Sequence, residues 1–420
     1  MNEDPVTLLT APGQELLATL TAEPGKGSMA LAERLRRQYP AGLVALAMTQ
    51  RELRLAAAAK FSRAADMLFT RAGYEQSSSE AIARYRAARL AGAGPGGAGR
   101  VADLCCGIGG DLTGLAGVAE VLAVDRDEVH ARLALHNAAV YGLADRVTAV
   151  VSDVRDVRLA GLAAVFIDPA RRSGPGTASA AGAHRFRAGL SEPPLDWCTG
   201  LAGQVPAVCV KAAPGLPADL VPPGWEAEFI AEGRDLKEAV LWSPALATAP
   251  VAAPPGGPPG PRRATVMAAA AEAQAQPGHA TLVARPGDPV PLRAPGEYLL
   301  DPNPAVTRAG LVEDLARTLG GDAAKIDPQI AFLTLERSVQ TPFARTLRVE
   351  DSAPWNEKRF ARRLRELGVG AADIRRRGLA GDVDQIHRRL KLSGPNRATL
   401  VITRVNDKPW GLICTDATPV

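Results

Sequence analysis

The sequence predicts an α/β protein in which a parallel sheet is preceded by a helical segment and followed by a small α+β domain. Three observations support this fold class. Residues 28–93 carry apolar side chains at three- and four-residue spacing, which is typical of helices packed on one face. From Arg100 onward, short apolar runs alternate with helical stretches, as in βαβ units. Beyond residue 304 strands and helices follow in the order of a small α+β domain, and a chain of 420 residues is expected to form two or three domains.

The helical segment is expected to cover residues 1–95. Within it, Ser77 and Glu80 stand at the spacing of a capping box, which predicts a helix start there. The glycine- and alanine-rich stretch 91–97 has the composition of a hinge. We therefore place the parallel-sheet domain at residues 96–248.

The parallel-sheet domain contains short apolar runs with the length and composition of strands. We predict strands at residues 100–104, 120–125, 147–153, 163–169, 206–212, 227–233 and 238–244. The last two runs are joined by the short Arg-Asp-Leu-Lys sequence, which suits an antiparallel pair that closes one edge of the sheet.

A proline- and glycine-rich region, residues 249–304, is expected to link this domain to the C-terminal part. Its stretch 250–261 holds six prolines and three glycines in twelve residues, a composition typical of an extended linker or an exposed loop. Residues 305–420 begin with a helical stretch that Gly320 can cap. Strands and two further helices follow, so we predict a small α+β domain there.

Composition and charge restrict the class of protein. No apolar run reaches the roughly 20 residues of a membrane span. The start, MNEDPVTLL, lacks the pattern of a signal peptide, so we expect a cytoplasmic protein with no membrane partner. The five cysteines have no zinc-site spacing, and we expect no metal. Residues 336–420 carry 17 basic and 10 acidic residues, whereas the net charge of the whole chain is only +4. The positive charge is thus concentrated in this C-terminal tail, which indicates a nucleic-acid partner.

A glycine-rich loop with acidic neighbours predicts a nucleotide-like cofactor. Residues 101–116, VADLCCGIGGDLTGLA, have the order strand, glycine turn, helix, and the glycines let the backbone approach a ligand closely. Asp103 lies on the first strand, and Asp125 ends the second, where a carboxylate can accept hydrogen bonds from ribose hydroxyls. Asp153 ends the third strand. Asp111 replaces the third small residue of a GxGxxG loop, and its charge disfavours a pyrophosphate but suits an ammonium group, although it can also simply cap a helix.

These stretches resemble the motifs of class I S-adenosylmethionine-dependent methyltransferases, which have a Rossmann-like sheet. VADLCCGIGGD, AVDRD, VVSDVRD and FIDPARR match those motifs in order, within residues 100–245. The resemblance implies S-adenosylmethionine as cofactor, with Asp125 on the ribose and Asp153 near the adenine amino group. The residues expected around the methionine part come from the glycine loop and the strand before it: Asp103, Cys105, Gly107, Gly109, Gly110 and Asp111.

The whole chain also resembles bacterial methyltransferases that carry a helical N-terminal segment and a THUMP-like C-terminal domain. Residues 60–79, 297–316 and 356–369 carry this likeness. THUMP domains belong to RNA-modifying enzymes, so the resemblance implies an RNA partner.

The stretch VFIDPARRSG, residues 165–174, is the candidate catalytic motif. Its apolar run predicts a buried strand that stops at Pro169, which places Asp168 in the crevice at the carboxyl end of the sheet. In methyltransferases that act on nitrogen, an Asp/Asn-Pro-Pro-aromatic motif at this place accepts hydrogen bonds from the target amine. Asp168 and Pro169 match that motif, whereas Ala170 and Arg171 do not. We expect Phe186 or Trp197 to supply the missing stacking ring, unless they are ordinary packing residues.

Arg171 resembles instead the arginine of the Asp-Pro-Pro-Arg motif in uridine C5 methyltransferases. Those enzymes need a nucleophilic cysteine after the next strand, where this chain has Lys211-Ala212-Ala213-Pro214, and Cys209 is expected inside the strand. A C5 mechanism is therefore disfavoured. Arg171 and Arg172 are either phosphate contacts or a solvated pair, and Lys211 is either a substrate contact or a surface lysine at a strand end.

The C-terminal tail contains a short basic helix with Arg359, Arg362 and Arg363, which either binds RNA phosphates or is a solvated face. We predict a methyltransferase that acts on a nitrogen of structured RNA, tRNA or rRNA, presented by this domain. The alternatives are a methyltransferase acting on protein or a small molecule, and a non-catalytic RNA-binding protein with a methyltransferase fold.

Overall fold

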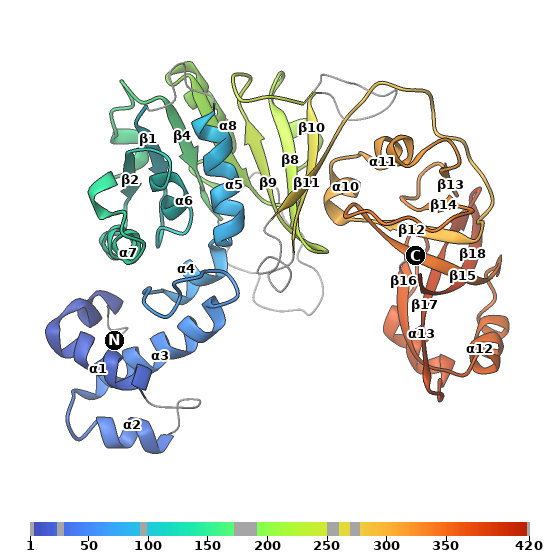
Figure 1. Ribbon diagram of the computed structural model, residues 1–420, viewed down its shortest axis with the longest axis horizontal. Helices are drawn as coiled ribbons and strands as arrows, with labels where there is room; N and C mark the ends of the chain where they lie inside the picture. The colour runs from blue at the N-terminus through green and yellow to red at the C-terminus, as the bar shows by residue number, and fades with distance from the viewer. Residues whose placement is uncertain are drawn as a thin grey trace. The chain divides into compact units, whose positions relative to one another are not determined.

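The computed structural model describes residues 4–22, 29–92, 99–171, 191–249, 260–268 and 278–417 (Figure 1). The chain divides into two compact units. The first unit comprises Met1–Ala227, Lys237–Thr248 and Ala270–Gln274, and the second comprises Glu228–Leu236, Ala249–Ala269 and Ala275–Val420. The helical segment, expected at residues 1–95, and most of the parallel-sheet domain, expected at residues 96–248, thus fall within one unit, whereas residues 228–236 belong to the other.

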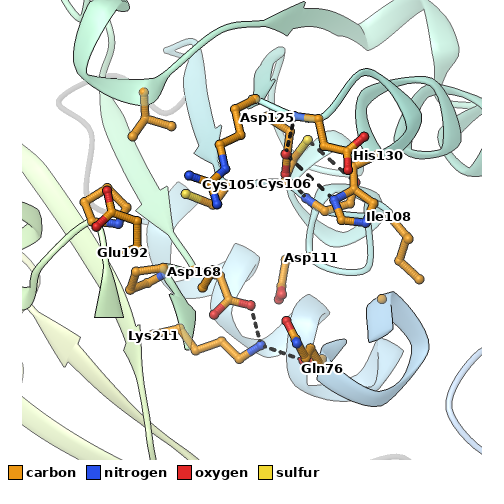
Figure 2. Close-up of a pocket in the computed structure, with 18 of the residues that line it drawn as sticks. Gln76, Cys105, Cys106, Ile108, Asp111, Asp125, His130, Asp168, Glu192 and Lys211 are labelled. Carbon is orange, nitrogen blue, oxygen red and sulfur yellow. Dashed lines mark hydrogen bonds and ion pairs between the residues drawn. The ribbon is translucent and has the colours of Figure 1, made fainter. Parts of the chain in front are cut away.

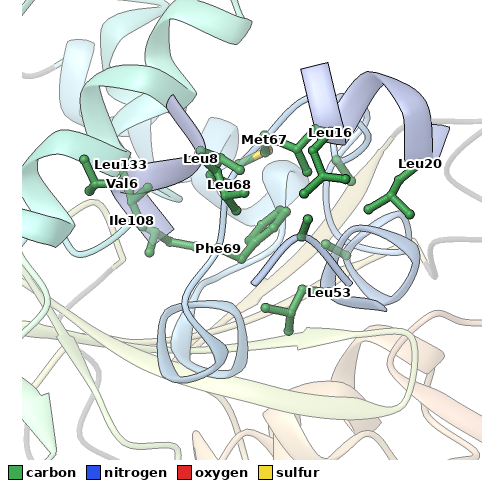
Figure 3. Close-up of a cluster of buried hydrophobic side chains, with 14 of the residues drawn as sticks. Val6, Leu8, Leu16, Leu20, Leu53, Met67, Leu68, Phe69, Ile108 and Leu133 are labelled. Carbon is green, nitrogen blue, oxygen red and sulfur yellow. The ribbon is translucent and has the colours of Figure 1, made fainter. Parts of the chain in front are cut away.

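The helical segment belongs to this unit because it shares a hydrophobic core with the sheet domain. Its elements are η1(Pro5–Leu9), α1(Ala11–Ala22), α2(Met29–Leu35), α3(Ala41–Ala57), α4(Arg71–Gln76) and α5(Glu80–Ala91). Leu16 of α1 and Met67, from the stretch between α3 and α4, are buried together with Ile108 and Leu133 of the sheet domain (Figure 3). Burial of this common core stabilises both parts at once.

In the first unit, six strands lie side by side in the order β9-β7-β4-β1-β2-β3. They are β1(Val101–Leu104), β2(Val121–Asp125), β3(Val147–Val151), β4(Ala164–Ile167), β7(Ala207–Ala212) and β9(Asp235–Trp242). The first five are parallel, and β9 runs antiparallel to β7. These strands confirm the predicted parallel sheet. The strand order reverses beside β1, and ligands of such sheets bind at the carboxyl ends of the strands near this reversal.

The connections of this sheet are mostly short helices. They are α6(Leu112–Ala116), α7(Glu128–Val140), η2(Ala144–Arg146), η3(Val154–Asp156), α8(Leu195–Gly200), η4(Leu201–Gly203) and η5(Ala218–Leu220). Two short strands, β5(Ala170–Arg171) and β6(Ser191–Glu192), pair with each other beyond β4. The helix α6 approaches α5 closely, since a side chain at Gly114 would lie 2.7 Å from the Ala83 carbonyl oxygen.

The second unit contains a seven-stranded sheet with the order β13-β14-β12-β15-β18-β17-β16. The strands are β12(Tyr298–Pro302), β13(Ala324–Lys325), β14(Leu333–Leu335), β15(Ala344–Pro354), β16(Val369–Arg376), β17(Asn396–Val405) and β18(Lys408–Asp416). The helices are α10(Pro304–Arg308), α11(Val312–Leu319), α12(Glu357–Glu366) and α13(Val383–Leu390). Successive residues of β17 face opposite sides, so Leu400 packs in one core with Phe360 of α12, and Val401 packs in another with Phe332. This α+β domain was predicted.

The region 249–304 differs from the predicted linker, because part of it forms strands. Besides β12, it contains β10(Arg262–Met267) and β11(His279–Val283), which pair antiparallel. In the strand order, β10 lies next to β8(Glu226–Glu232), and β11 lies next to β10. β8 is therefore not an edge strand, which differs from the predicted antiparallel pair that closes the sheet edge. Buried Ala264, Thr265 and Val266 stabilise β10, and the flanking prolines and glycines hid this apolar run from composition. Residues 250–259 of the proline-rich stretch lie outside the described residues.

Candidate active site

A pocket of about 310 Å³ opens at the carboxyl ends of β1, β2 and β4 in the first unit (Figure 2). The glycine loop after β1, the ends of β2 and β4, Lys211 of β7 and residues of α4 line it. The sequence predicts the cofactor site and the catalytic motif at this edge of the sheet. A cavity of this size holds a small-molecule ligand.

The glycine loop adopts backbone conformations that favour glycine. Gly107 and Gly109 have φ angles of 53° and 83°. A side chain at Gly109 would lie 3.0 Å from the Ala134 Cα of α7, whereas a side chain at Gly107 would meet no atom within 4 Å. Cys105 also has a left-handed φ angle of 62°, which is uncommon for a residue with a side chain. The loop is thus shaped for close approach of a ligand at Gly107.

Asp125 is fixed by the glycine loop and by the start of α7. Its two carboxylate oxygens accept hydrogen bonds from the Gly107 N–H at 2.9 Å and the Asp127 N–H at 3.0 Å. The His130 Nδ1 lies 3.8 Å from Oδ1. Burial alone would raise the pKa of Asp125, but interactions with His130 and with these two N–H groups bring the pKa below its usual value. Since each oxygen has a second lone pair, Asp125 can still accept hydrogen bonds from a ligand.

Asp111 is engaged by an arginine from the helical segment. Arg86 of α5 is 1% exposed and forms ion pairs with both Asp111 and Glu238 of β9. Its guanidinium also donates a hydrogen bond to Ser78 Oγ at 2.8 Å. The charge of Asp111, which we expected to face an ammonium group, is therefore partly offset within the protein, because Asp111 shares Arg86 with Glu238. Arg86, Glu238 and Ser78 were not among the predicted site residues.

Asp103 lies beneath the loop, is 1% exposed, and neither of its carboxylate oxygens has a hydrogen-bond partner among the described residues. Burial raises its pKa well above the usual value, and the neighbouring Asp111, Asp168 and Asp125 carboxylates raise it further. This environment favours the protonated acid, which can donate one hydrogen bond. Buried polar atoms without a partner are rare, and they fit a site that a bound group completes.

Asp153 and its neighbours form the far side of the pocket. The Asp153 carboxylate accepts hydrogen bonds from the Arg155 N–H at 2.9 Å and from the Arg155 guanidinium at 3.1 Å. Arg155 also pairs with Glu192 of β6 at 2.5 Å, and this contact raises the pKa of Arg155. The Arg155 guanidinium carbon lies 5.8 Å from the centre of the Trp197 ring. Trp197 does not line the pocket.

The catalytic motif ends β4 as the sequence predicts. Asp168 follows Ile167, and its N–H donates to the Leu104 carbonyl, which holds the strand end beside β1. Lys211 of β7 is 6% exposed, and its Nζ lies 2.6 Å from Asp168 Oδ2 and 3.2 Å from the Gln76 carbonyl oxygen (Figure 2). Lys211 is therefore a buried partner of Asp168 and not a surface lysine.

The remaining predicted residues of this motif are placed only in part. Pro169 lines the pocket. Arg171 belongs to β5. Arg172 and Phe186 lie outside the described residues. Cys209 is fully buried in β7 and does not line the pocket, which agrees with a disfavoured C5 mechanism.

The predicted arginines of the C-terminal helix α12 have acidic partners. Arg359 pairs with Asp351 at 3.1 Å, and Arg363 pairs with Glu366 at 3.2 Å. The Arg362 side chain is 73% exposed and lies 3.6 Å from Glu366. Surface ion pairs of this kind are weak, so a phosphate can compete for the arginines.

Within the described ranges of the chain, no helix combines the length and the apolar character that crossing a membrane would require. No group of three or more histidine, cysteine, aspartate and glutamate side chains there has an arrangement that could hold a metal ion.

Family models match three parts of the chain. A THUMP domain-like model matches residues 344–416, and a model for RNA cap guanine-N2 methyltransferases matches residues 98–180. A model described as a domain of unknown function matches residues 3–57. The C-terminal domain is thus THUMP-like, as its sequence predicted.

Whole-chain comparisons agree with these matches. The chain is 34% identical over 354 residues to an uncharacterized S-adenosylmethionine-dependent methyltransferase of Mycobacterium tuberculosis, found in strains CDC 1551 and H37Rv. The match covers 80% of this chain and 85% of the relative. A crystal structure of a methyltransferase from Porphyromonas gingivalis W83 has the same fold, with a TM-score of 0.74 at 20% identity over all of both chains. The chain belongs to the S-adenosylmethionine-dependent methyltransferases.

Proposed function

We propose that this methyltransferase acts in the cytoplasm on a nitrogen of a base in structured RNA, tRNA or rRNA, which the C-terminal domain presents. The observation that carries the nitrogen target is the position of Asp168 and Pro169. They end β4 in the same pocket as the glycine loop and Asp125, so an acceptor held by Asp168 lies beside the cofactor.

Most of the cofactor residues of this proposal line the pocket, whereas Asp103 and Gly109 do not. Asp125 would hold the ribose hydroxyls through its unused lone pairs, and Asp153 would lie near the adenine. Gly107 would let the backbone approach the methionine part, and Asp103 would offer a hydrogen bond there. Bound S-adenosylmethionine supplies an electrophilic methyl group on a sulfonium. The residues of the chain contribute mainly by orienting the two reactants, which is where most of the rate enhancement comes from.

Asp168 orients the acceptor in this mechanism. One of its carboxylate oxygens accepts a hydrogen bond from Lys211, and the other can accept one from the amine to be methylated. This hydrogen bond directs the nitrogen lone pair toward the methyl carbon. The Pro169 carbonyl can accept a second N–H and fix the plane of the amine.

An RNA substrate is supported by three observations. The family model over residues 98–180 is that of enzymes that methylate a guanine nitrogen in RNA, and the model over residues 344–416 is THUMP-like. The tail from residue 336 carries the excess of positive charge. The exposed Arg362 of α12, with Arg359 and Arg363, can contact phosphates and position the RNA without reading its sequence.

Nucleoside mass spectrometry of total RNA from a strain lacking this protein, compared with its parent, tests the proposal. We expect one methylated nucleoside to be lost, with the methyl group on nitrogen. The purified protein should restore it in RNA from the deletion strain with radiolabelled S-adenosylmethionine. Unchanged RNA, together with label transferred to protein or small molecules of an extract, would refute the RNA substrate. A methyl group on C5 of uridine would refute the nitrogen target.

RNA binding by the tail is tested with the Arg359→Gln, Arg362→Gln, Arg363→Gln triple variant. Glutamine is a comparable helix former, so α12 should remain folded. The affinity of the native protein for the RNA should fall steeply with salt, and the triple variant should show a shallower slope because fewer counterions are released. Filter binding at several salt concentrations measures both slopes. Equal slopes would show that these arginines form only a solvated face.

A further inference from the structure

Three elements converge on Asp168, and one of them belongs to the helical segment. Asp168 ends β4, Lys211 belongs to β7, and the Gln76 carbonyl is the last one of α4 (Figure 2). The Lys211 ammonium donates to both acceptors, at 2.6 Å and 3.2 Å. The side chain of Asp168 is 30% exposed toward the pocket, whereas that of Lys211 is 6% exposed.

The contacts leave the two oxygens of Asp168 in different situations. Oδ2 receives the Lys211 ammonium. No group in the described part of the chain donates a hydrogen bond to Oδ1, so this oxygen is available to a ligand in the pocket. Rotation of the carboxylate would break the contact with a buried ammonium, and an unpaired buried charge is strongly unfavourable. The two oxygens are equivalent, so the ion pair fixes the orientation of the carboxylate and leaves the oxygen that Lys211 does not hold facing the pocket.

The charges around the pocket increase the importance of this contact. Asp168 lies close enough to Asp103 and Cys105 for its charge to act on both groups. The charges of Asp111 and Asp125 also raise the pKa of Asp103. Without Lys211, the Asp168 carboxylate would lie among acidic neighbours with no cation against it, and repulsion would turn it away from them.

We propose that Lys211 is a positioning residue: it holds Asp168 Oδ2 so that Oδ1 faces the acceptor nitrogen, and α4 fixes Lys211 through the Gln76 carbonyl. This inference rests on the proposed role of Asp168. It makes the helical N-terminal segment part of the catalytic arrangement, because α4 supplies the second acceptor that aims the ammonium. Lys211 itself does not contact the acceptor.

A double-variant cycle with Lys211→Met and Asp168→Asn distinguishes positioning from a structural role. Methionine has a similar length without the charge. Asparagine keeps an oxygen acceptor but needs no cation. Lys211→Met should slow methyl transfer by about 30-fold or more in the native background, because the acceptor is no longer aligned. In the Asp168→Asn background it should change the rate by less than about threefold, because the carboxylate charge that Lys211 pairs with is already gone.

The assay is transfer of labelled methyl groups to RNA from the deletion strain, at saturating S-adenosylmethionine. Calorimetry should give an S-adenosylmethionine affinity for Lys211→Met within about threefold of the native value, since Lys211 contacts Asp168 and not the cofactor.

Lys211→Arg should recover most of the rate, because its guanidinium can reach both acceptors. Lys237→Met, at an exposed position on the neighbouring strand β9, is the matched control and should leave the rate unchanged. Equal effects of Lys211→Met in the two backgrounds would overturn the proposal.

Crystal structures of the native protein and Lys211→Met with S-adenosylhomocysteine test whether Lys211 positions Asp168, and they need no RNA substrate. We expect the Asp168 carboxylate to leave its native rotamer in the variant and to keep it in Lys211→Arg. An unchanged Asp168 in Lys211→Met would overturn the positioning role. If the native protein transfers no methyl group to RNA, the proposed substrate fails, and the rotamer comparison still tests Lys211.

Discussion

Replacing Asn137 should uncouple the helical segment from the cofactor domain. Asn137 of α7 is fully buried and makes three hydrogen bonds through its side chain. It accepts one from the Leu68 N–H at 2.9 Å, and it donates to the carbonyl oxygens of Leu68 at 2.9 Å and Ile108 at 2.8 Å. One side chain thus connects the stretch between α3 and α4 with the glycine loop.

The cost of losing this connection can be worked out from those contacts. A hydrogen bond contributes about 1 kcal/mol to stability, so Asn137→Ala should lower the free energy of unfolding by about 3 kcal/mol. This is a lower bound, because three buried backbone groups lose their partner. For a unit of this size, 1 kcal/mol corresponds to about 2–4 °C, so the melting temperature should fall by about 6–12 °C. Asn137→Asp should cost more, since its second oxygen would face two carbonyl oxygens.

Differential scanning calorimetry of the native protein and both variants measures these shifts. Arg132→Ala, on the exposed face of the same helix, is the control and should leave the melting temperature within about 1 °C. Calorimetric titration should also show weaker S-adenosylmethionine binding by Asn137→Ala, because Ile108 belongs to the glycine loop. A fall of less than about 2 °C for Asn137→Ala would refute the reasoning.

Three further predictions concern the first unit. Asp125→Ala should weaken S-adenosylmethionine binding by about 1.5–3 kcal/mol in calorimetry, the usual value for lost hydrogen bonds to a charged group, and unchanged affinity would exclude the ribose contact. Asp125 raises the pKa of His130, so the ion pair should stabilise the fold fully below about pH 6.5 and lose this effect as the pH rises through the raised pKa. The melting temperatures of the native protein and His130→Gln should therefore converge over that pH range. A difference that stays constant with pH would contradict this role of the pair. Gly114→Ala should destabilise the protein by about 1–3 kcal/mol in urea unfolding, because the new methyl group would collide with the Ala83 carbonyl. Gly203→Ala is the control and should not destabilise the protein, because its methyl group would meet no atom within 4 Å.

The parallel sheet and the positions of the motif residues could be predicted because they depend on local patterns. Buried parallel strands are continuous apolar runs, and their carboxyl ends meet at one edge of the sheet. That geometry brings Asp125 and Asp168 to one pocket, and it buries Asp103 on β1, the strand before the glycine loop. The strand β10 was missed because prolines and glycines around it dominated the composition of its region.

The partners of these residues could not be predicted, because they depend on how the helical segment packs. Arg86 reaches Asp111 across 25 residues, and the Gln76 carbonyl reaches Lys211 across 135 residues. One signal was present in the sequence. The buried residues Ile82, Ala83, Ala87 and Leu90 form one face of α5, and Arg86 lies on that same face. An arginine within an apolar face requires a buried acidic partner, which identifies the position but not the partner.

The helical segment therefore determines the charge of the pocket. A cationic methyl donor needs a site with negative charge, and the sequence suggested Asp111 for this role. Arg86 of α5 is shared by Asp111 and Glu238, Lys211 held by α4 pairs with Asp168, and the environment of Asp103 favours its neutral form. Asp125 is different, because its surroundings lower its pKa and so favour its charged form. Negative charge therefore remains at Asp125 and at the Asp111 and Glu238 carboxylates that share Arg86, and two of the residues that set this distribution are placed by α4 and α5.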